Sequence, residues 1–299
     1  MSTEVKKVLF IVNKFAGGKY RPELEGHITD ACAGCNIDAV IRHTEGPSHA
    51  TTLAYSAAEL GVQCVVAVGG DGTINETARG LVGTGIPLAI IPKGSGNGLA
   101  RHLGIPLTTK AAMHAFVTGE TFAMDTFTLN GKLSLNVSGI GFDGHIANLF
   151  GGSTKRGLTG YASLTMKEFL RFQEFEFVLS RDNGGSLNRK AFVLAIANSS
   201  QYGNNAWIAP RASVSDGLLH INILKKIPPY RFDFVYAFFA KTIDRSPYSE
   251  ILEERSFRIE TKFPVPYHVD GEPCGEDTVF NVAIMPSALH VIAPAMSRR

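Results

Sequence analysis

The sequence predicts a chain of two domains: a doubly wound α/β domain over residues 1–124 and an all-β, antiparallel sandwich-like domain over residues 125–287. Strands and helices alternate through the first part, which is the pattern of a parallel sheet covered by helices. Near Met124 the pattern changes to strands joined by short turns such as Asn130-Gly131, a strong type I′ hairpin signal. The length of 299 residues is ample for two hydrophobic cores. We expect the active site to lie in the cleft between the domains.

Composition and charge exclude several classes of function. The 29 basic and 27 acidic residues leave a net charge of +2 without a long basic run, so we expect no nucleic acid partner. Four cysteines are typical of a reducing compartment, and a polar N-terminus without a signal peptide favours a cytoplasmic location. No apolar run reaches the roughly 18 residues of a membrane span. Any contact with a membrane would therefore be made at its surface, with the protein associated peripherally.

The first domain shows its elements in strand–helix order. Ser48 can cap the second helix, and Gly61 ends it. The elements expected around the central strand are strands over 5–12, 37–43 and 87–91, and helices over 22–32, 48–60, 99–103 and 110–117.

Residues 65–82 organise this domain as a buried strand, a glycine turn and a helix. Four apolar residues end at Gly69-Gly70, and apolar residues at helical spacing follow from Ile74 onward. Glycines let a backbone approach a ligand closely, and the amide groups at a helix N-terminus favour phosphate. Asp71 stands among these glycines. A carboxylate beside phosphates indicates that it works through Mg²⁺ or receives a proton.

A second glycine loop follows the next strand, with the sequence Gly94-Ser95-Gly96-Asn97. It matches neither the dinucleotide fingerprint, because its third glycine comes one position early, nor a Walker A loop. Two strand–glycine–helix units in succession end at the same edge of a parallel sheet, where ligands bind in open α/β folds. The pair therefore predicts a ligand site at that edge.

The second domain is expected to be antiparallel. Its turn His268–Glu272 places two carboxylates, Asp270 and Glu272, on either side of a glycine, and either could accept a proton as a general base. The stretches 164–177 and 232–239 are rich in aromatic residues and could contact lipid, although we favour core packing for both. The expected strands cover 122–129, 132–138, 174–180, 190–198, 218–224, 256–261, 278–285 and 289–293.

The two glycine loops resemble the catalytic domain of diacylglycerol kinases and sphingosine kinases, most of all the soluble bacterial lipid kinases of that family. The matching residues are Gly69-Gly70-Asp71-Gly72-Thr73, Asn75-Glu76 and Gly94-Ser95-Gly96-Asn97. NAD kinases share the first of these elements but not the second loop in this form. The resemblance implies an NAD-kinase-like first domain, to which the last strand, about residues 288–299, could return.

The resemblance also implies roles for individual residues. Asp71 is expected to be catalytic, and the general base is expected to be either Asp270 or Glu272. ATP is the expected phosphate donor. The residues expected to contact it are Asn13, Thr44, Gly69, Gly70, Asp71, Gly72, Thr73, Asn75, Glu76, Gly94, Ser95 and Asn97.

Mg²⁺ is the second expected cofactor. Bacterial relatives hold a structural Mg²⁺ at a loop that matches this chain around residues 213–218. The ligands here would be Asp216 and the backbone carbonyls of Ser213 and Leu218, since Mg²⁺ usually completes its octahedral set of oxygens with water.

The function expected from these features is that of an ATP-dependent lipid kinase, which transfers the γ-phosphate to a hydroxyl of a diacylglycerol-like or sphingoid lipid. The alternative is a kinase of a soluble metabolite such as NAD, and a nucleotide sensor without turnover is a third class. The sequence specifies neither the lipid nor the oligomeric state, and it is compatible with a homodimer.

Overall fold

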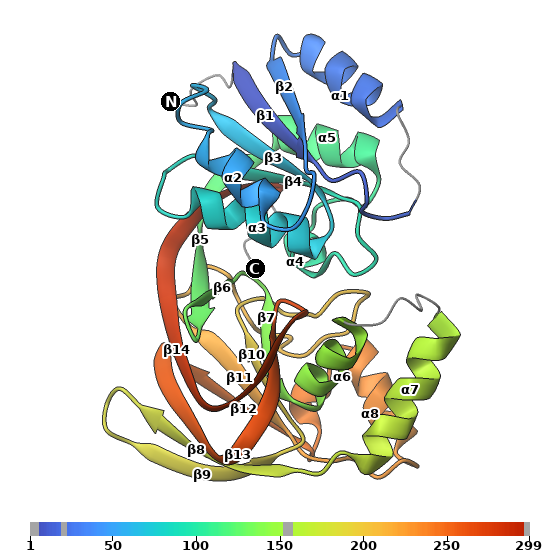
Figure 1. The fold of residues 1–299 in the computed structure, drawn as a ribbon, viewed down its shortest axis with the longest axis vertical. Helices are drawn as coiled ribbons and strands as arrows, with labels where there is room; N and C mark the ends of the chain where they lie inside the picture. The colour runs from blue at the N-terminus through green and yellow to red at the C-terminus, as the bar shows by residue number, and fades with distance from the viewer. Residues whose placement is uncertain (1–5, 19–22, 152–157, 296–299) are drawn as a thin grey trace. The chain divides into compact units, whose positions relative to one another are not determined.

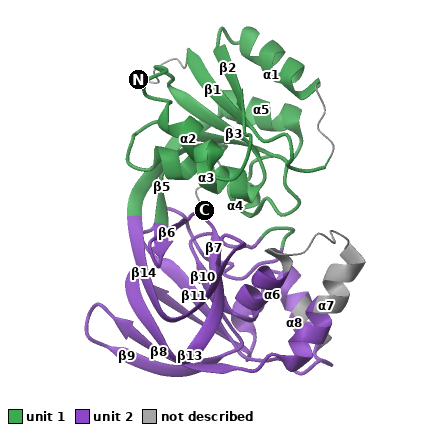
Figure 2. Ribbon diagram, viewed as in Figure 1, with its two compact units in different colours: residues 1–126, 203–205, 286–299 green, residues 127–202, 206–285 purple. Residues whose placement is uncertain are grey.

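The protein, seen in a computed structural model, is described over residues 6–18, 23–151 and 158–295 (Figure 1). It divides into two units (Figure 2). The first comprises residues 1–126, 203–205 and 286–299, and the second comprises residues 127–202 and 206–285. Two strands, β5 (Glu120–Leu129) and β14 (Glu272–Ala293), continue from one unit into the other.

The first unit contains a parallel sheet in the order β14-β4-β3-β1-β2. Its central strands are buried because helices cover the sheet, α1 packing with α5 and α2 with α3 (Figure 1). The doubly wound prediction is confirmed. The elements are β1 (Lys7–Val12), α1 (Glu23–Ala33), β2 (Asp38–His43), α2 (His49–Tyr55), β3 (Cys64–Gly69), α3 (Asp71–Leu81), β4 (Leu88–Pro92), α4 (Gly98–His102) and α5 (Thr109–Thr118).

The C-terminal end of β14 belongs to the first unit, where Val291 pairs in parallel with Leu88 of β4. We expected two strands, over 278–285 and 289–293, but the structure has one strand of 22 residues. Ser287, between the two expected strands, has a positive φ of 52°, and its backbone N–H donates to the Asp125 carboxylate at 2.7 Å. That hydrogen bond gives the N–H of this irregular residue a partner within the continuous strand.

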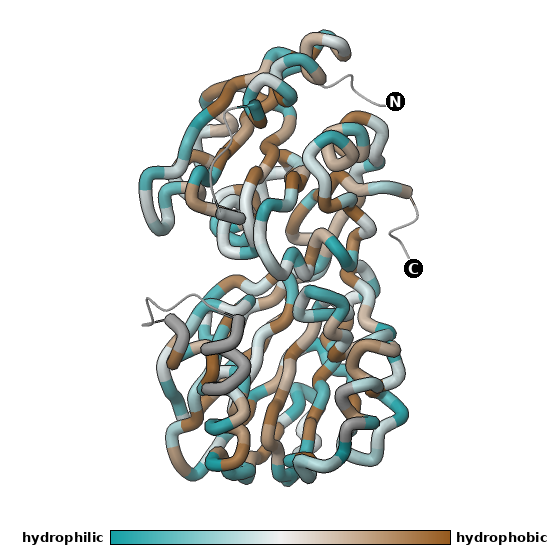
Figure 3. Tube along the Cα trace, turned by 90° about the vertical axis from the view of Figure 1, so that its right-hand side faces the viewer, coloured by the Kyte–Doolittle hydropathy of each residue, from teal (hydrophilic) through white to brown (hydrophobic). Residues whose placement is uncertain are grey.

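The second unit is mainly antiparallel, in the order β12-β11-β10-β7-β13-β14, with the hairpins β5–β6 on β14 and β8–β9 on β13. The predicted sandwich-like class is confirmed. Alternating side chains of these strands form one apolar core, and Figure 3 shows hydrophobic stretches along them. The strands are β6 (Lys132–Ser134), β7 (Val137–Gly141), β8 (Phe175–Arg181), β9 (Ser186–Ala191), β10 (Val193–Ala197), β11 (Leu219–Leu224), β12 (Ser249–Glu254) and β13 (Ser256–Val269).

Two of the expected strands of this unit are each split in two, because backbone groups bond outside the expected ladder. In addition, β12 was not expected, and β13 continues to Val269 beyond the expected range 256–261. The expected strand over 132–138 is split into β6 and β7, since the N–H groups of Leu135 and Asn136 donate to the Asp270 carboxylate. The expected strand over 190–198 is split at Phe192, where β9, paired with β8, gives way to β10, paired with β7 and β11. At that point the Phe192 N–H donates to the carbonyl of Leu224.

Three helices cover part of this unit: α6 (Phe142–Gly151), α7 (Leu158–Arg171) and α8 (Phe232–Phe239). The first was not expected from the sequence. On α8, Phe234 is 9% exposed and Phe238 is half-buried, and both pack in a cluster with Phe142 and Phe192. The expectation of core packing is therefore confirmed for the side chains of Phe234 and Phe238. The side chain of Phe232 lies outside the described part. Within the described residues, no helix is both long and apolar enough to cross a bilayer.

Candidate active site

The two glycine loops of the first unit lie in backbone contact. Gly69 ends β3 and Gly70 precedes α3, while the second loop follows β4. A Cβ added to Gly94 would lie 2.8 Å from the Cα of Gly70, and one added to Gly69 would lie 2.5 Å from the side chain of Thr73. Only glycine allows this approach. The structure thus brings together the two loops that the sequence placed at one sheet edge.

Asp71 joins the loops through its carboxylate. Oδ2 accepts the N–H of Asn97 and Oδ1 accepts the N–H of Gly98, both at 2.9 Å. These amides belong to the N-terminal end of the short helix α4, whose donors have no partner within the helix. Asp71 therefore braces the second loop. This contact links positions 26 and 27 residues apart, and the sequence offered no signal for it.

Asn97 closes the second loop from inside. Its side chain accepts the N–H of Gly94 at 2.8 Å and donates to the carbonyl of Gly94 at 2.7 Å, and it is buried. The neighbouring Ser95 is exposed. A segment from the second half of the chain lies against this loop, since Asn97 forms an isolated bridge with Gly203 and the N–H of Asn204 donates to the Gly96 carbonyl. The loop is thereby held in one conformation.

The expected contact residues before the first loop, Asn13 and Thr44, directly follow the strands β1 and β2. Asn13 donates from its side chain to the Thr73 hydroxyl at 2.9 Å, and Thr73 itself is buried. The loop that follows β1 lies directly against the second glycine loop, because a Cβ on Gly17 would fall 2.0 Å from the carbonyl oxygen of Lys93. Thr44 follows β2 and is buried, its N–H donating to the carbonyl of Val12. These residues lie beyond the ends of parallel strands, as the sequence predicts.

Glu76 and Asn75 lie further along α3, in surroundings that the sequence did not indicate. The Glu76 carboxylate accepts the N–H groups of Ser48 (2.9 Å) and Ala50 (3.3 Å), at the start of α2. The prediction that the Ser48 side chain caps α2 is wrong, because Ser48 takes a left-handed conformation and Glu76 supplies the acceptor. Asn75 is buried. Gly72 sits in the first turn of α3, beside Asp71.

In the second unit, Asp270 and Gly271 form the turn between β13 and β14. Both have positive φ, 48° and 85°, as a type I′ turn requires. The Asp270 carboxylate accepts three hydrogen bonds, from the Ser134 hydroxyl (2.6 Å), the Leu135 N–H (2.8 Å) and the Asn136 N–H (3.0 Å). Asp270 thus fixes the turn to the end of β6, and Glu272 begins the next strand.

A buried polar group on the other flank of this turn was missed by the sequence analysis. His268 accepts the N–H of Gly271 at its Nδ1 (3.0 Å), and its Nε2 lies 3.3 Å from the Asp143 carboxylate. The Tyr202 hydroxyl donates to the same Asp143 oxygen at 2.9 Å. A histidine two residues before a predicted catalytic carboxylate was the available signal.

The loop predicted to hold Mg²⁺ is an Asx turn. Asp216 is exposed, and its Oδ1 accepts the N–H of Leu218 at 3.0 Å, while Gly217 has a positive φ of 73°. Ser213 lies three residues earlier and its hydroxyl accepts the N–H of Ser215. Among the described residues, no group of three or more His, Cys, Asp or Glu could hold a metal ion. One exposed carboxylate beside backbone carbonyls is a donor set that fits an ion keeping several waters.

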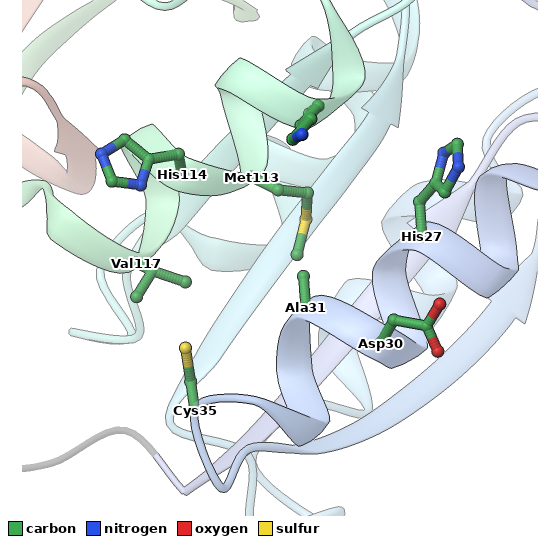
Figure 4. Close-up of a pocket in the computed structure, with 8 residues that line it drawn as sticks. His27, Asp30, Ala31, Cys35, Met113, His114 and Val117 are labelled. Atoms are coloured by element: carbon green, nitrogen blue, oxygen red, sulfur yellow. The ribbon is translucent and has the colours of Figure 1, made fainter.

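A separate pocket of about 520 Å³ lies in the first unit between α1 and α5 (Figure 4). It contains none of the glycine-loop residues. Its lining residues are His27, Asp30, Ala31, Cys35, Lys110, Met113, His114 and Val117.

Comparison with known proteins covers both units. Residues 7–129 match the family model for the diacylglycerol kinase catalytic domain, and residues 137–293 match the YegS C-terminal NAD kinase beta sandwich-like domain. A protein of Chromohalobacter salexigens named "Probable lipid kinase YegS-like" is 32% identical over 249 residues, covering 81% of this chain and 79% of its own. The "Probable lipid kinase YegS" of Escherichia coli is 29% identical over 265 residues, covering 85% and 86%.

The solved structures agree in fold. The crystal structure of a diacylglycerol kinase from Bacillus anthracis superposes with a TM-score of 0.77 and covers 99% of this chain and all of that one, at 23% identity. This chain has both matched domains, the braced glycine loops and the Asp-Gly-Glu turn. It belongs to the diacylglycerol kinase family, in its YegS-like branch of lipid kinases.

Proposed function

We propose that the protein is an ATP-dependent lipid kinase that phosphorylates a hydroxyl of a diacylglycerol-like or sphingoid lipid. The observation that carries this proposal is the pair of glycine loops braced by Asp71. Phosphoryl transfer depends mainly on positioning and charge stabilisation, so a preorganised backbone cradle is the feature that this chemistry needs. The backbone N–H groups of Gly69–Thr73 and of Ser95 and Gly96 would face the phosphates of ATP, because those of Gly94 and Asn97 already donate to the side chains of Asn97 and Asp71.

The second unit would supply the acceptor side of the reaction. The lipid hydroxyl attacks the γ-phosphorus, a new oxygen–phosphorus bond forms, and the bond to the β-phosphate bridging oxygen breaks to release ADP. A carboxylate takes the hydroxyl proton. We assign that step to Glu272, because both oxygens of Asp270 already accept hydrogen bonds that hold the turn. Asp270 would have to give up a structural contact to accept a proton.

The assay that tests the proposal uses labelled ATP with a panel of lipids in mixed micelles, and NAD as a parallel substrate. We expect labelled phospholipid product from at least one neutral lipid with a free hydroxyl. Phosphorylation of NAD with none of any lipid would replace the lipid-kinase assignment by the soluble-metabolite alternative.

Mg²⁺ is part of the proposal, held by Asp216 with the carbonyls of Ser213 and Leu218. Bound at this exposed loop, the ion would have a structural role and stabilise the second unit. An ion that binds only the folded state stabilises it, by about 2.7 kcal/mol at a concentration 100 times its Kd.

We expect the wild-type melting temperature to be higher in Mg²⁺ than in chelator, and Asp216→Ala to abolish that difference. Asp182→Ala, an exposed turn carboxylate of the same unit, is the control and should keep it. A wild type that melts equally in both buffers would contradict the metal assignment.

A membrane surface is the partner that the proposed substrate requires, since each CH₂ taken out of a bilayer costs about 0.8 kcal/mol. On α8, Tyr236 is 74% and Phe239 is 55% exposed, unlike their neighbours in the core. We expect Tyr236→Ser with Phe239→Ser to lower binding to lipid vesicles in a sedimentation assay while ATP binding is kept. Phe263→Ser removes another exposed aromatic of this unit and serves as the matched control. Equal vesicle binding by both variants and the wild type would remove α8 from the docking surface.

A further inference from the structure

Two side chains hold the Asp-Gly-Glu turn, one on each flank. Asp270 belongs to the turn itself, whereas His268 precedes it. Asp270 anchors the first flank to the end of β6. The second flank is Gly271, whose N–H donates to Nδ1 of His268. His268 is 4% exposed, so water does not compete strongly for this bond.

The hydrogen bonds of His268 define its tautomer. A neutral imidazole has one donor and one acceptor nitrogen. Because Nδ1 accepts the Gly271 N–H, the ring proton is on Nε2, which faces the Asp143 carboxylate at 3.3 Å. Asp143 therefore stabilises the one tautomer that leaves Nδ1 available for the turn.

Asp143 lies in the first turn of α6 and is itself fixed by two donors. Its Oδ1 accepts the N–H of Gly144 at 2.8 Å, and its Oδ2 accepts the Tyr202 hydroxyl at 2.9 Å. Burial, and then the neighbouring Asp143 charge, raise the pKa of Tyr202 well above its ordinary value, so this hydroxyl remains a donor. The chain of contacts runs from Tyr202 through Asp143 and His268 to Gly271.

Two glycines make the room that this arrangement needs. A Cβ on Gly139 would fall 1.8 Å from Oδ2 of Asp143, in the space that the carboxylate occupies. A Cβ on Gly144 would fall 2.5 Å from the Cα of Tyr267, so α6 packs directly on the backbone of β13 beside His268. Backbone contacts of this kind cannot yield as a flexible side chain would.

We propose that His268 is a positioning residue for phosphoryl transfer, with Asp143 and Tyr202 holding it in the required tautomer. By accepting the Gly271 N–H, His268 sets the direction in which the chain leaves the turn, and hence the place of the Glu272 carboxylate in the next residue. The inference rests on the proposed function, in which Glu272 accepts the hydroxyl proton. A misplacement of about 1 Å can cost on the order of 100-fold in rate, so the effect should be large enough to measure.

The test compares two substitutions of similar bulk. His268→Leu removes the acceptor, and His268→Asn retains one, since the Asn amide oxygen can occupy nearly the place of Nδ1. We expect the Leu variant to lose about 10- to 100-fold in kcat. Its affinity for ATP should be unchanged, because the two glycine loops belong to the other unit. The Asn variant should recover at least half of that loss on a logarithmic scale. Amide hydrogen exchange at Gly271 gives a readout without turnover, and it should be faster in the Leu variant than in the Asn variant.

A second variant keeps the test decisive if the Leu protein does not fold. Tyr202→Phe removes one hydroxyl, and we expect it to lower kcat several-fold at unchanged ATP affinity. Tyr248→Phe, which removes a half-buried hydroxyl bonded to Arg231 in the same unit, is the matched control and should keep the wild-type kcat.

Each outcome is informative. A folded Leu variant with wild-type kcat, equal losses in the Leu and Asn variants, or a Tyr202→Phe variant as active as the Tyr248→Phe control would overturn the positioning role. A wild-type protein that phosphorylates no lipid would instead overturn the proposed function, while the exchange rates at Gly271 would still report whether His268 holds the turn.

Discussion

Glu272→Gln is expected to lower kcat by about 10²- to 10⁴-fold while ATP binding is preserved. The amide is nearly isosteric with the carboxylate but cannot accept the proton that the lipid hydroxyl loses in the transition state. Steady-state kinetics with labelled ATP, together with an ATP-binding titration, separate the two effects. The melting temperature should stay close to that of the wild type.

Two further variants show whether the loss is specific to the base. Glu276→Gln changes an exposed carboxylate of the same strand and should leave kcat unchanged. Asp270→Asn should lower activity and melting temperature together, because its new amide group would face the N–H donors of Leu135 or Asn136. If Glu272→Gln turns over normally and Asp270→Asn is inactive at full stability, the base is Asp270.

Asp71→Asn is the second change with a large expected effect. Hydrogen bonds to a charged group contribute about 1.5–3 kcal/mol each, and this carboxylate accepts two. The amide can accept only one of the two N–H groups and turns a donor toward the other. We expect the second glycine loop to loosen, ATP affinity to fall roughly 10- to 100-fold for the loss of one such bond, and lipid phosphorylation to become barely detectable.

Calorimetric titration of ATP and circular dichroism check this prediction. Asp38→Asn, an exposed carboxylate at the start of β2, is the control and should bind ATP as the wild type does. A folded Asp71→Asn protein with near-wild-type ATP affinity and kcat would show that the brace is not required for catalysis.

Local features were predictable from the sequence because they depend on residues close together in the chain. Gly69-Gly70 after four buried apolar residues indicated the strand–turn–helix unit, and Asn130-Gly131 indicated a hairpin, whose two residues indeed have positive φ. The helix α6 was missed because its first turn, next to Gly144, owes its position to tertiary packing on β13.

The roles of the acidic residues required the structure. Asp71, Glu76 and Asp270 were all expected to act on ligands, yet each carboxylate accepts backbone N–H groups from a segment distant in sequence. A carboxylate that braces a loop and one that faces a substrate have the same residue type and the same local spacing. Sequence patterns cannot separate them.

The sequence by itself determined the family, the two-domain class and the positions of the glycine loops and of the Asp-Gly-Glu turn, because apolar periodicity and glycine turns are encoded within short segments. Only the tertiary structure decided which carboxylates hold backbone in place, that Phe234 belongs to the core while Tyr236 is exposed, and that His268 supports the turn. These properties depend on which distant groups meet, since a buried donor or acceptor must find its partner wherever the fold brings one.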